Sequence, residues 1–123
     1  MGGVTRQPLR RGQIWWAWLD PLIGSEQAGR RPVVVVSTNE LLVGPTAIVV
    51  PLSTRLPDPI PSFIAVLPKE RSGLAEDSGA YGIHIRAIST QRLVRQVGHE
   101  LSVEDMRAID AALLYALGLE DAA

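Results

Sequence analysis

The fold is decided by a stretch that reads Gly24-Ser25-Glu26-Gln27-Ala28-Gly29-Arg30-Arg31-Pro32, followed by valines at positions 33 to 36 and by Ser37. The first half is small and polar, and its glycines are free to adopt the positive φ angles of a tight loop. Four consecutive valines disfavour a helix and are apolar on both faces of an extended chain, so the second half predicts a strand that is buried on both sides. Pro32 fits the first residue of such a strand. The stretch therefore holds a carboxylate and two guanidinium groups where a loop meets a rigid element, an arrangement common in binding and catalytic sites.

Further strands are predicted on both sides of this stretch. The strands cover residues 13–19, 32–38, 45–51, 62–67 and 80–88, with an exposed proline-rich loop at 55–61, a charged connection at 68–79, a helical turn at 91–94 and a short extended segment at 95–101. The first strand carries three tryptophans and is apolar on both faces. One face should therefore fill the core, and the other should be covered by another element, a partner subunit or stacked bases.

The chain ends in a predicted amphipathic helix that begins at the capping residue Ser102 and stops at Gly118. Its apolar stripe consists of Val103, Met106, Ile109, Leu113 and Leu117. Strands followed by one such helix predict an α+β fold. We expect one domain over residues 1–123, with a mobile tail at residues 1–8.

The composition excludes several classes of protein. Of the 123 residues, 46% are hydrophobic and 20% are charged, which is typical of a globular chain. There is no cysteine, and the two histidines lack ligand spacing, so neither a disulfide scaffold nor a metal centre is expected. Neither a signal peptide nor a membrane span is recognisable, which predicts a cytoplasmic protein. The net charge of −1 still permits a local basic patch, because six arginines lie in the strand-rich part: Arg10, Arg11, Arg30, Arg31, Arg55 and Arg86.

The stretch from Gly24 to Pro32, with the valine strand after it, resembles the first signature of the MazF/PemK family of toxin endoribonucleases. The other matching segments follow in the family's order: Arg11-Gly12, the tryptophan-rich strand, Asp20-Pro21, residues 45–54, residues 85–89 and the C-terminal helix. The resemblance implies a small antiparallel SH3-like β-barrel with a C-terminal helix. It also implies the toxin of a toxin–antitoxin pair, a homodimer that needs no cofactor or metal and is inhibited by a cognate antitoxin protein. Such a toxin cuts single-stranded RNA at short sequences and leaves 2′,3′-cyclic phosphate and 5′-hydroxyl ends.

The resemblance assigns candidate catalytic residues, and their chemistry suits the reaction. RNA cleavage by its own 2′-hydroxyl needs a base, donors that stabilise the phosphorane, and an acid. Arg31 stands at the family's catalytic arginine, and its planar guanidinium matches phosphate oxygens. Ser53 stands at the family's catalytic hydroxyl, where threonine is more usual, and should hydrogen-bond the scissile phosphate. Thr54 is the alternative, since a one-residue change of register exchanges the two side chains. Glu26 matches a carboxylate implicated in some relatives, either as general base or as a group that orients Arg31.

His84 departs from the family, which often has an acidic residue and glutamine where this chain has Ile83 and His84. A histidine there is able to act as acid or base, to stack on a nucleobase, or only to complete a strand. The general base is therefore open between Glu26 and His84. The candidate RNA-binding residues are Gln27, Arg30, Thr54, His84 and Arg86.

Two rival functions remain open at this stage. The first is a binding module of the same fold that poisons DNA gyrase, as the CcdB proteins do, although the Gly24–Pro32 signature is typical of the RNases. The second is a catalytically silent barrel that only binds protein or nucleic acid. The proposed toxin would be a homodimer that buries part of the first strand, and a groove lined by Arg31 and Arg86 would attract RNA or an acidic antitoxin.

Overall fold

The structure is a computed structural model, and it describes residues 8–19 and 29–119 of the chain. The tail predicted at residues 1–8 lies outside these ranges except for Pro8. The strands are β1 (Ile14–Leu19), β2 (Gly29–Val35), β3 (Thr46–Ser53), β4 (Ile64–Leu67), β5 (Ser78–Tyr81), β6 (Arg86–Ser89) and β7 (Leu93–Val97). The α-helices are α1 (Lys69–Ser72) and α2 (Val103–Ala116), and short 3-10 helices cover Asn39–Val43, Gly82–His84 and Thr90–Arg92. Neither α-helix in the described ranges has the length and apolarity that crossing a bilayer requires.

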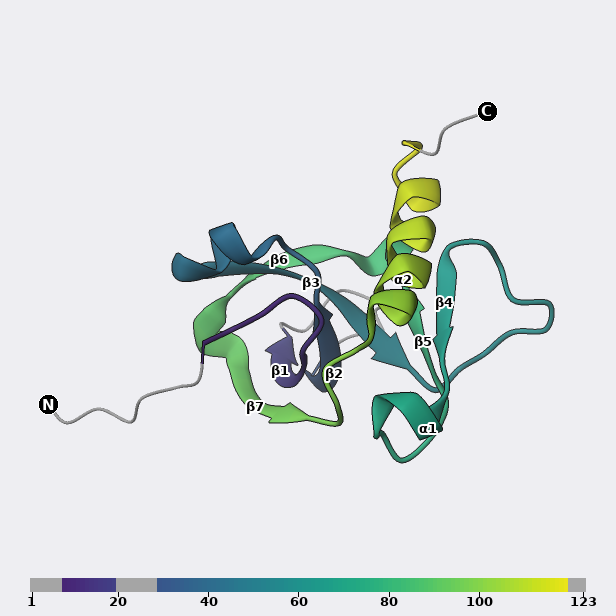
Figure 1. Cartoon of the computed structure of the whole chain (residues 1–123), viewed down its shortest axis with the longest axis horizontal. Helices are drawn as coiled ribbons and strands as arrows, with labels where there is room; N and C mark the ends of the chain where they lie inside the picture. The colour runs from purple at the N-terminus through teal and green to yellow at the C-terminus, as the bar shows by residue number, and fades with distance from the viewer. Residues whose placement is uncertain (1–7, 20–28, 120–123) are drawn as a thin grey trace, which may run out of the picture.

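The seven strands form one antiparallel sheet in the order β4-β5-β3-β2-β1-β7, and β6 pairs with β3 (Figure 1). The predicted α+β class, antiparallel sheet and C-terminal helix are confirmed. The strands of the predicted barrel are present, but the sheet is not closed, because β4 and β7 end it and do not pair with each other within the described ranges. The helix α2 packs against β4 and on the face of the sheet that carries Val34 and Leu52.

The strand predicted at 80–88 is two strands separated by a turn. β5 ends at Tyr81, the 3-10 helix Gly82–His84 follows, and β6 begins at Arg86. Gly82 explains the break, since a Cβ at this position would lie 3.0 Å from the carbonyl oxygen of Ala112 in α2. The chain therefore turns where its backbone meets the helix. The preceding connection also differs from expectation, because it contains α1 and the first residues of β5.

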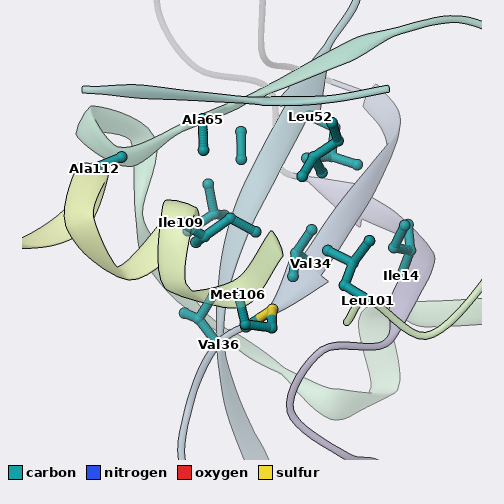
Figure 2. Close-up of a cluster of buried hydrophobic side chains, with 12 residues drawn as sticks. Ile14, Val34, Val36, Leu52, Ala65, Leu101, Met106, Ile109 and Ala112 are labelled. Carbon is teal, nitrogen blue, oxygen red and sulfur yellow. The ribbon is translucent and has the colours of Figure 1, made fainter. Parts of the chain in front are cut away.

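The valine strand is buried on both sides, as predicted. Val33 and Val35 face a cluster that includes Trp15 of β1, whereas Val34 faces a second cluster on the other side of the sheet. Figure 2 shows the second cluster, in which Met106, Ile109 and Ala112 of α2 point toward Val34, Leu52 and Ala65. The sheet therefore separates two cores, and β2 and β3 contribute to both.

The apolar stripe predicted for α2 is only partly correct. Met106 and Ile109 are buried, but Val103 is 69% exposed and Leu117 is 53% exposed. Asp105 is buried in their place. Its carboxylate accepts hydrogen bonds of 3.1 and 2.9 Å from Nε and Nη2 of Arg71, which joins α1 to the first turn of α2.

The helix begins as predicted, because the Ser102 hydroxyl accepts the backbone N–H of Asp105 at 3.1 Å.

The ion pair between Arg71 and Asp105 affects the titration of Arg71. The hydrogen bond that Arg71 donates to Asp105, together with the negative charge of Asp105, raises the pKa of the Arg71 guanidinium. A group whose pKa is raised on folding stabilises the fold below its unfolded pKa and loses that effect only as the pH rises through the folded value. This ion pair is therefore not weakened by deprotonation of Arg71 at any pH where the protein is handled.

Truncating a buried side chain of α2 should destabilise the protein more than truncating an exposed one. Ile109→Ala should lower the free energy of unfolding by about 2–5 kcal/mol, because it opens a cavity between α2 and the sheet. Leu117→Ala should change it by no more than about 0.5 kcal/mol, since the side chain is mostly exposed. Urea unfolding followed by circular dichroism measures both values. Equal losses would mean that the predicted stripe, and not the observed burial, describes the helix.

Candidate functional site

Arg31 and Ser53 lie just beyond the paired parts of β2 and β3. The pairing of these strands ends at Val33 and Pro51, and Arg31 and Ser53 each lie two residues beyond this last pair. Each therefore shares a face of its strand with the last paired residue, because side chains alternate along a strand. Both residues line the same hollow. Two residues that are 22 positions apart in sequence are thus brought together by pairing between the strands.

A hollow of about 240 Å³ opens at this end of the sheet. Its walls are formed by the ends of β2 and β3, by β1 and by the segment that leads into β5: Trp16, Arg31, Pro32, Leu52, Ser53, Thr54, Leu74, Ala75, Glu76 and Ser78. Polar groups on a mostly apolar floor are typical of small-molecule and substrate sites. Trp16 and Glu76 were not predicted as site residues, because no local pattern links residues 74–78 to the valine strand.

The Ser53 hydroxyl is held in place by the backbone of the turn that follows it. Its Oγ accepts the N–H of Arg55 at 3.1 Å, which is the local bond expected of an ordinary residue at a strand end. The Arg55 carbonyl in turn accepts a hydrogen bond from the Tyr81 hydroxyl. The backbone N–H and carbonyl of Arg55 are therefore both hydrogen-bonded, which fixes the turn after β3. A serine hydroxyl that accepts one bond still has its own hydrogen to donate, so Ser53 is able to bind a phosphate oxygen.

His84 belongs to a neighbouring aromatic group. Its ring stacks on Tyr81, with 5.6 Å between ring centroids and 7° between the planes. Its Nδ1 is buried and has no hydrogen-bond partner among the described residues. His84 does not line the hollow, and it connects to Ser53 only through Tyr81 and Arg55. Sequence reasoning missed Tyr81 as the connecting residue.

Arg30 and Arg86 also lie outside the hollow. Arg86 is on β6 opposite Val49, and its Nη1 is buried without a hydrogen-bond partner in the described ranges. Arg30 is exposed on β2, next to the tryptophans of β1. The structure therefore brings together three predicted residues, Arg31, Ser53 and Thr54. The predicted Glu26 and Gln27 lie outside the described residues.

The positive charge near the hollow comes from a subset of the arginines. Arg10 pairs with Glu100, and Arg11 pairs with Asp110 while donating to the Val36 carbonyl, so these two hold the fold together. By contrast, Arg30, Arg55 and Arg86 form no ion pair with any described residue. The described ranges contain no cluster of three or more side chains suited to holding a metal ion. The arrangement offers an arginine and a fixed hydroxyl to an anionic group.

Comparison with known proteins identifies a family and several relatives. The model of the family described as "PemK-like, MazF-like toxin of type II toxin-antitoxin system" matches residues 10–117. The chain is 36% identical over 117 residues to the endoribonuclease MazF9 of Mycobacterium tuberculosis, covering 90% of this chain and 98% of that protein. It is also 36% identical over 116 residues to the endoribonuclease EndoA of Bacillus subtilis, covering 92% and 97%.

Solved structures show the same fold at lower sequence identity. MazF from Deinococcus radiodurans (Form-I) superposes with a TM-score of 0.74 at 23% identity, covering 92% of this chain and 99% of that one. A mycobacterial endoribonuclease in complex with its cognate antitoxin gives a TM-score of 0.73 at 21% identity, covering 92% and 98%. The chain therefore shares its overall fold with these proteins.

Proposed function

Because this chain belongs to the PemK-like, MazF-like family of toxins of type II toxin–antitoxin systems, we propose that it is a metal-independent, sequence-specific endoribonuclease acting on single-stranded RNA. The two relatives that match almost the whole chain are both named endoribonucleases, which favours this function over a CcdB-like gyrase poison. The observation that carries the proposal is the meeting of Arg31 and Ser53 at one hollow. An arginine fork and a hydroxyl donor suit a phosphate that gains negative charge during reaction.

The proposed reaction is an internal transesterification. A base removes the proton from the 2′-hydroxyl, the 2′-oxygen forms a bond to phosphorus, and the bond from phosphorus to the 5′-oxygen breaks. An acid gives a proton to the departing 5′-oxygen, so the products are a 2′,3′-cyclic phosphate and a 5′-hydroxyl. Arg31 stabilises the charge on the phosphorane, and Ser53 donates its hydroxyl hydrogen to a phosphate oxygen. Ser53 is not a nucleophile in this scheme, because its Oγ is bound to the Arg55 N–H.

Three residues are candidates for the general base. Glu26 is the residue favoured by family resemblance. Glu76 lines the hollow and is the one carboxylate that does so among the described residues. His84 lies outside the hollow, where its ring stacks on that of Tyr81. A base must come within hydrogen-bond reach of the 2′-hydroxyl, so Glu76 competes with Glu26 on position, and His84 needs the RNA to extend over Tyr81.

The surroundings of the hollow support RNA as the substrate and an acidic protein as the inhibitor. We assign RNA binding to Gln27, Arg30, Thr54, His84 and Arg86. The arginines without carboxylate partners would contact phosphates, and Thr54 lines the hollow itself. The same positive charge would attract an acidic antitoxin peptide, which would exclude RNA by competition. The proposal places the protein in the cytoplasm, where its RNA and antitoxin are made.

We further propose that the chain acts as one domain and as a homodimer. Every described strand belongs to a single sheet, and α2 packs on that sheet, which supports one domain over residues 1–123. The dimer expected to cover part of the first strand would use the face of Trp16 and Trp18, because Trp15, Ala17 and Leu19 are already buried within the chain. Exposed apolar side chains also lie on α2, at Leu114 and Leu117. Both surfaces are therefore candidates for the contact between subunits.

The test of the function is to incubate the protein with a long RNA in EDTA and to map the ends that form. Cleavage at one short sequence, with cyclic phosphate and 5′-hydroxyl ends, is expected. A matched RNA with a single 2′-deoxyribose 5′ of the cut should bind but resist cleavage, since the attacking hydroxyl is missing. Cleavage of the deoxy substrate at the same bond would exclude internal transesterification, and no cleavage of either RNA would refute the endoribonuclease proposal.

Arg31→Ala should reduce the single-turnover rate of cleavage by about 10²–10³-fold, because a donor to the transition state is lost. Ser53→Ala should cost less, since one neutral hydrogen bond is removed, and Ser53→Thr should retain activity. Arg107→Ala is the matched control, because this arginine is exposed on α2 and away from the hollow. Circular dichroism must show the same fold for all variants. Wild-type rates for Arg31→Ala would place the reaction elsewhere.

The base can be identified from the pH dependence of the single-turnover rate. Replacing the true base should remove the acidic limb of the profile, because that limb reports protonation of the base. The variants to compare are Glu26→Gln, Glu76→Gln and His84→Ala, and we expect the effect in Glu26→Gln. The two remaining variants should keep the limb. Loss of the limb in Glu76→Gln or in His84→Ala would transfer the role to that residue.

A further inference from the structure

Two tryptophans and an arginine form a ladder on the face of β1 and β2 that carries Ile14. Trp18 pairs directly with Arg30, and Trp16 pairs with Pro32, one step along on the same face. The guanidinium carbon of Arg30 lies 5.3 Å from the centroid of the Trp16 ring and 5.9 Å from that of Trp18. Both separations are within the range of a cation–π contact. The arginine therefore lies against both rings, and the three side chains form one surface.

Trp16 of this ladder is half-buried and Trp18 is exposed, although tryptophan is highly buried on average. Ile14, at the start of the same face, is fully buried in the core beneath α2, but Trp18 is 55% exposed. The helix packs against β4, at the opposite side of the sheet from β1 (Figure 1), so it does not reach this end of the strand. Arg30 is also exposed and has no carboxylate partner in the described chain. An exposed aromatic surface of this kind marks a site of interaction.

The ladder is continuous with the hollow that holds Arg31 and Ser53. Trp16 is a member of both, because its ring faces Arg30 and its side chain lines the hollow together with Pro32. Arg30 and Arg31 are adjacent in β2, and their side chains leave the strand on opposite faces. Trp16 is therefore the link between the ladder and the hollow, and a strand of RNA whose phosphate lies at Arg31 reaches the aromatic ladder by way of Trp16.

We propose that Trp18 and Arg30 extend Trp16 into a stacking subsite for a nucleobase next to the cleaved phosphate. This inference rests on the proposed endoribonuclease function. Single-stranded RNA is bound by aromatic rings that stack on bases, with arginines contributing cation–π contacts and charge. The ladder supplies both, and its position beside the hollow favours RNA over a protein partner. Trp18 is thus a binding residue outside the reacting centre, and it positions the RNA for cleavage.

The proposal is tested with a 12-nucleotide RNA that carries the mapped cleavage sequence and a 2′-deoxyribose at the cut, so that binding is measured without cleavage. Trp18→Leu keeps an apolar side chain but removes the aromatic ring, and it should weaken binding by about 5- to 150-fold. Trp18→Phe should restore most of the affinity. Tyr115→Leu is the matched control, because Tyr115 is an aromatic residue of α2 with a similar exposure of 51%. Both side chains are exposed, so all three variants should fold.

The base that stacks on Trp18 is located by combining these variants with abasic nucleotides at successive positions of the RNA. At one position beside the cut, removal of the base should weaken binding to the wild type and to Trp18→Phe but not to Trp18→Leu. Equal affinity of wild type and Trp18→Leu, in a wild type that binds and cuts RNA, would overturn the subsite and leave the proposed function intact. A change of oligomeric state in Trp18→Leu, or weakened binding of an acidic peptide alone, would overturn it in favour of a protein contact. A wild type that neither binds nor cuts RNA would refute both proposals.

Discussion

The pairing of β2 with β3 is the contact on which the rest of the structure depends. Val33, Val34 and Val35 pair with Pro51, Val50 and Val49, and all six side chains are buried. Because side chains alternate, each strand supplies residues to the cores on both faces of the sheet. A change of register by one residue would exchange the two cores and expose neither to water, but it would move every polar residue at the strand ends to the wrong face. The packing of the valines therefore also fixes the site.

The site follows from the ends of these two strands. Arg31 and Ser53 lie two residues beyond the last pair of the two strands and line one hollow, and the turn after β3 is fixed by the bonds that Arg55 makes to Ser53 and to Tyr81. These groups are supported by rigid strands, so they need little reorganisation when an anion binds. Preorganised donors of this kind stabilise a transition state more effectively than mobile ones. Two partly exposed ion pairs serve a different purpose, since Arg11 joins α2 to the segment before β1 and Arg71 joins α2 to α1.

Much of the fold could be predicted because its signals are local. The valine run, the Ser102 cap and the proline-rich loop each depend on a few neighbouring residues, and each was found at the expected place. Gly29 adopts the positive φ of 87° expected where the loop enters the strand. The errors concern contacts between distant segments. The break at Gly82 depends on the close approach of α2, and the exposure of Val103 and Leu117 depends on how much of the helix the sheet covers.

The residue types available for chemistry, and the strand ends at which Arg31 and Ser53 lie, can be read from the amino-acid sequence alone, because strand-forming patterns and family signatures consist of consecutive residues. What surrounds these residues depends on the packing of the folded chain. The tertiary structure places Glu76 at the hollow and stacks His84 on Tyr81 outside it. It also leaves Trp18 exposed on a strand that is apolar on both faces. The physical reason is that alternation in a strand says which side chains share a face, whereas burial of that face depends on elements far away in sequence that pack against it.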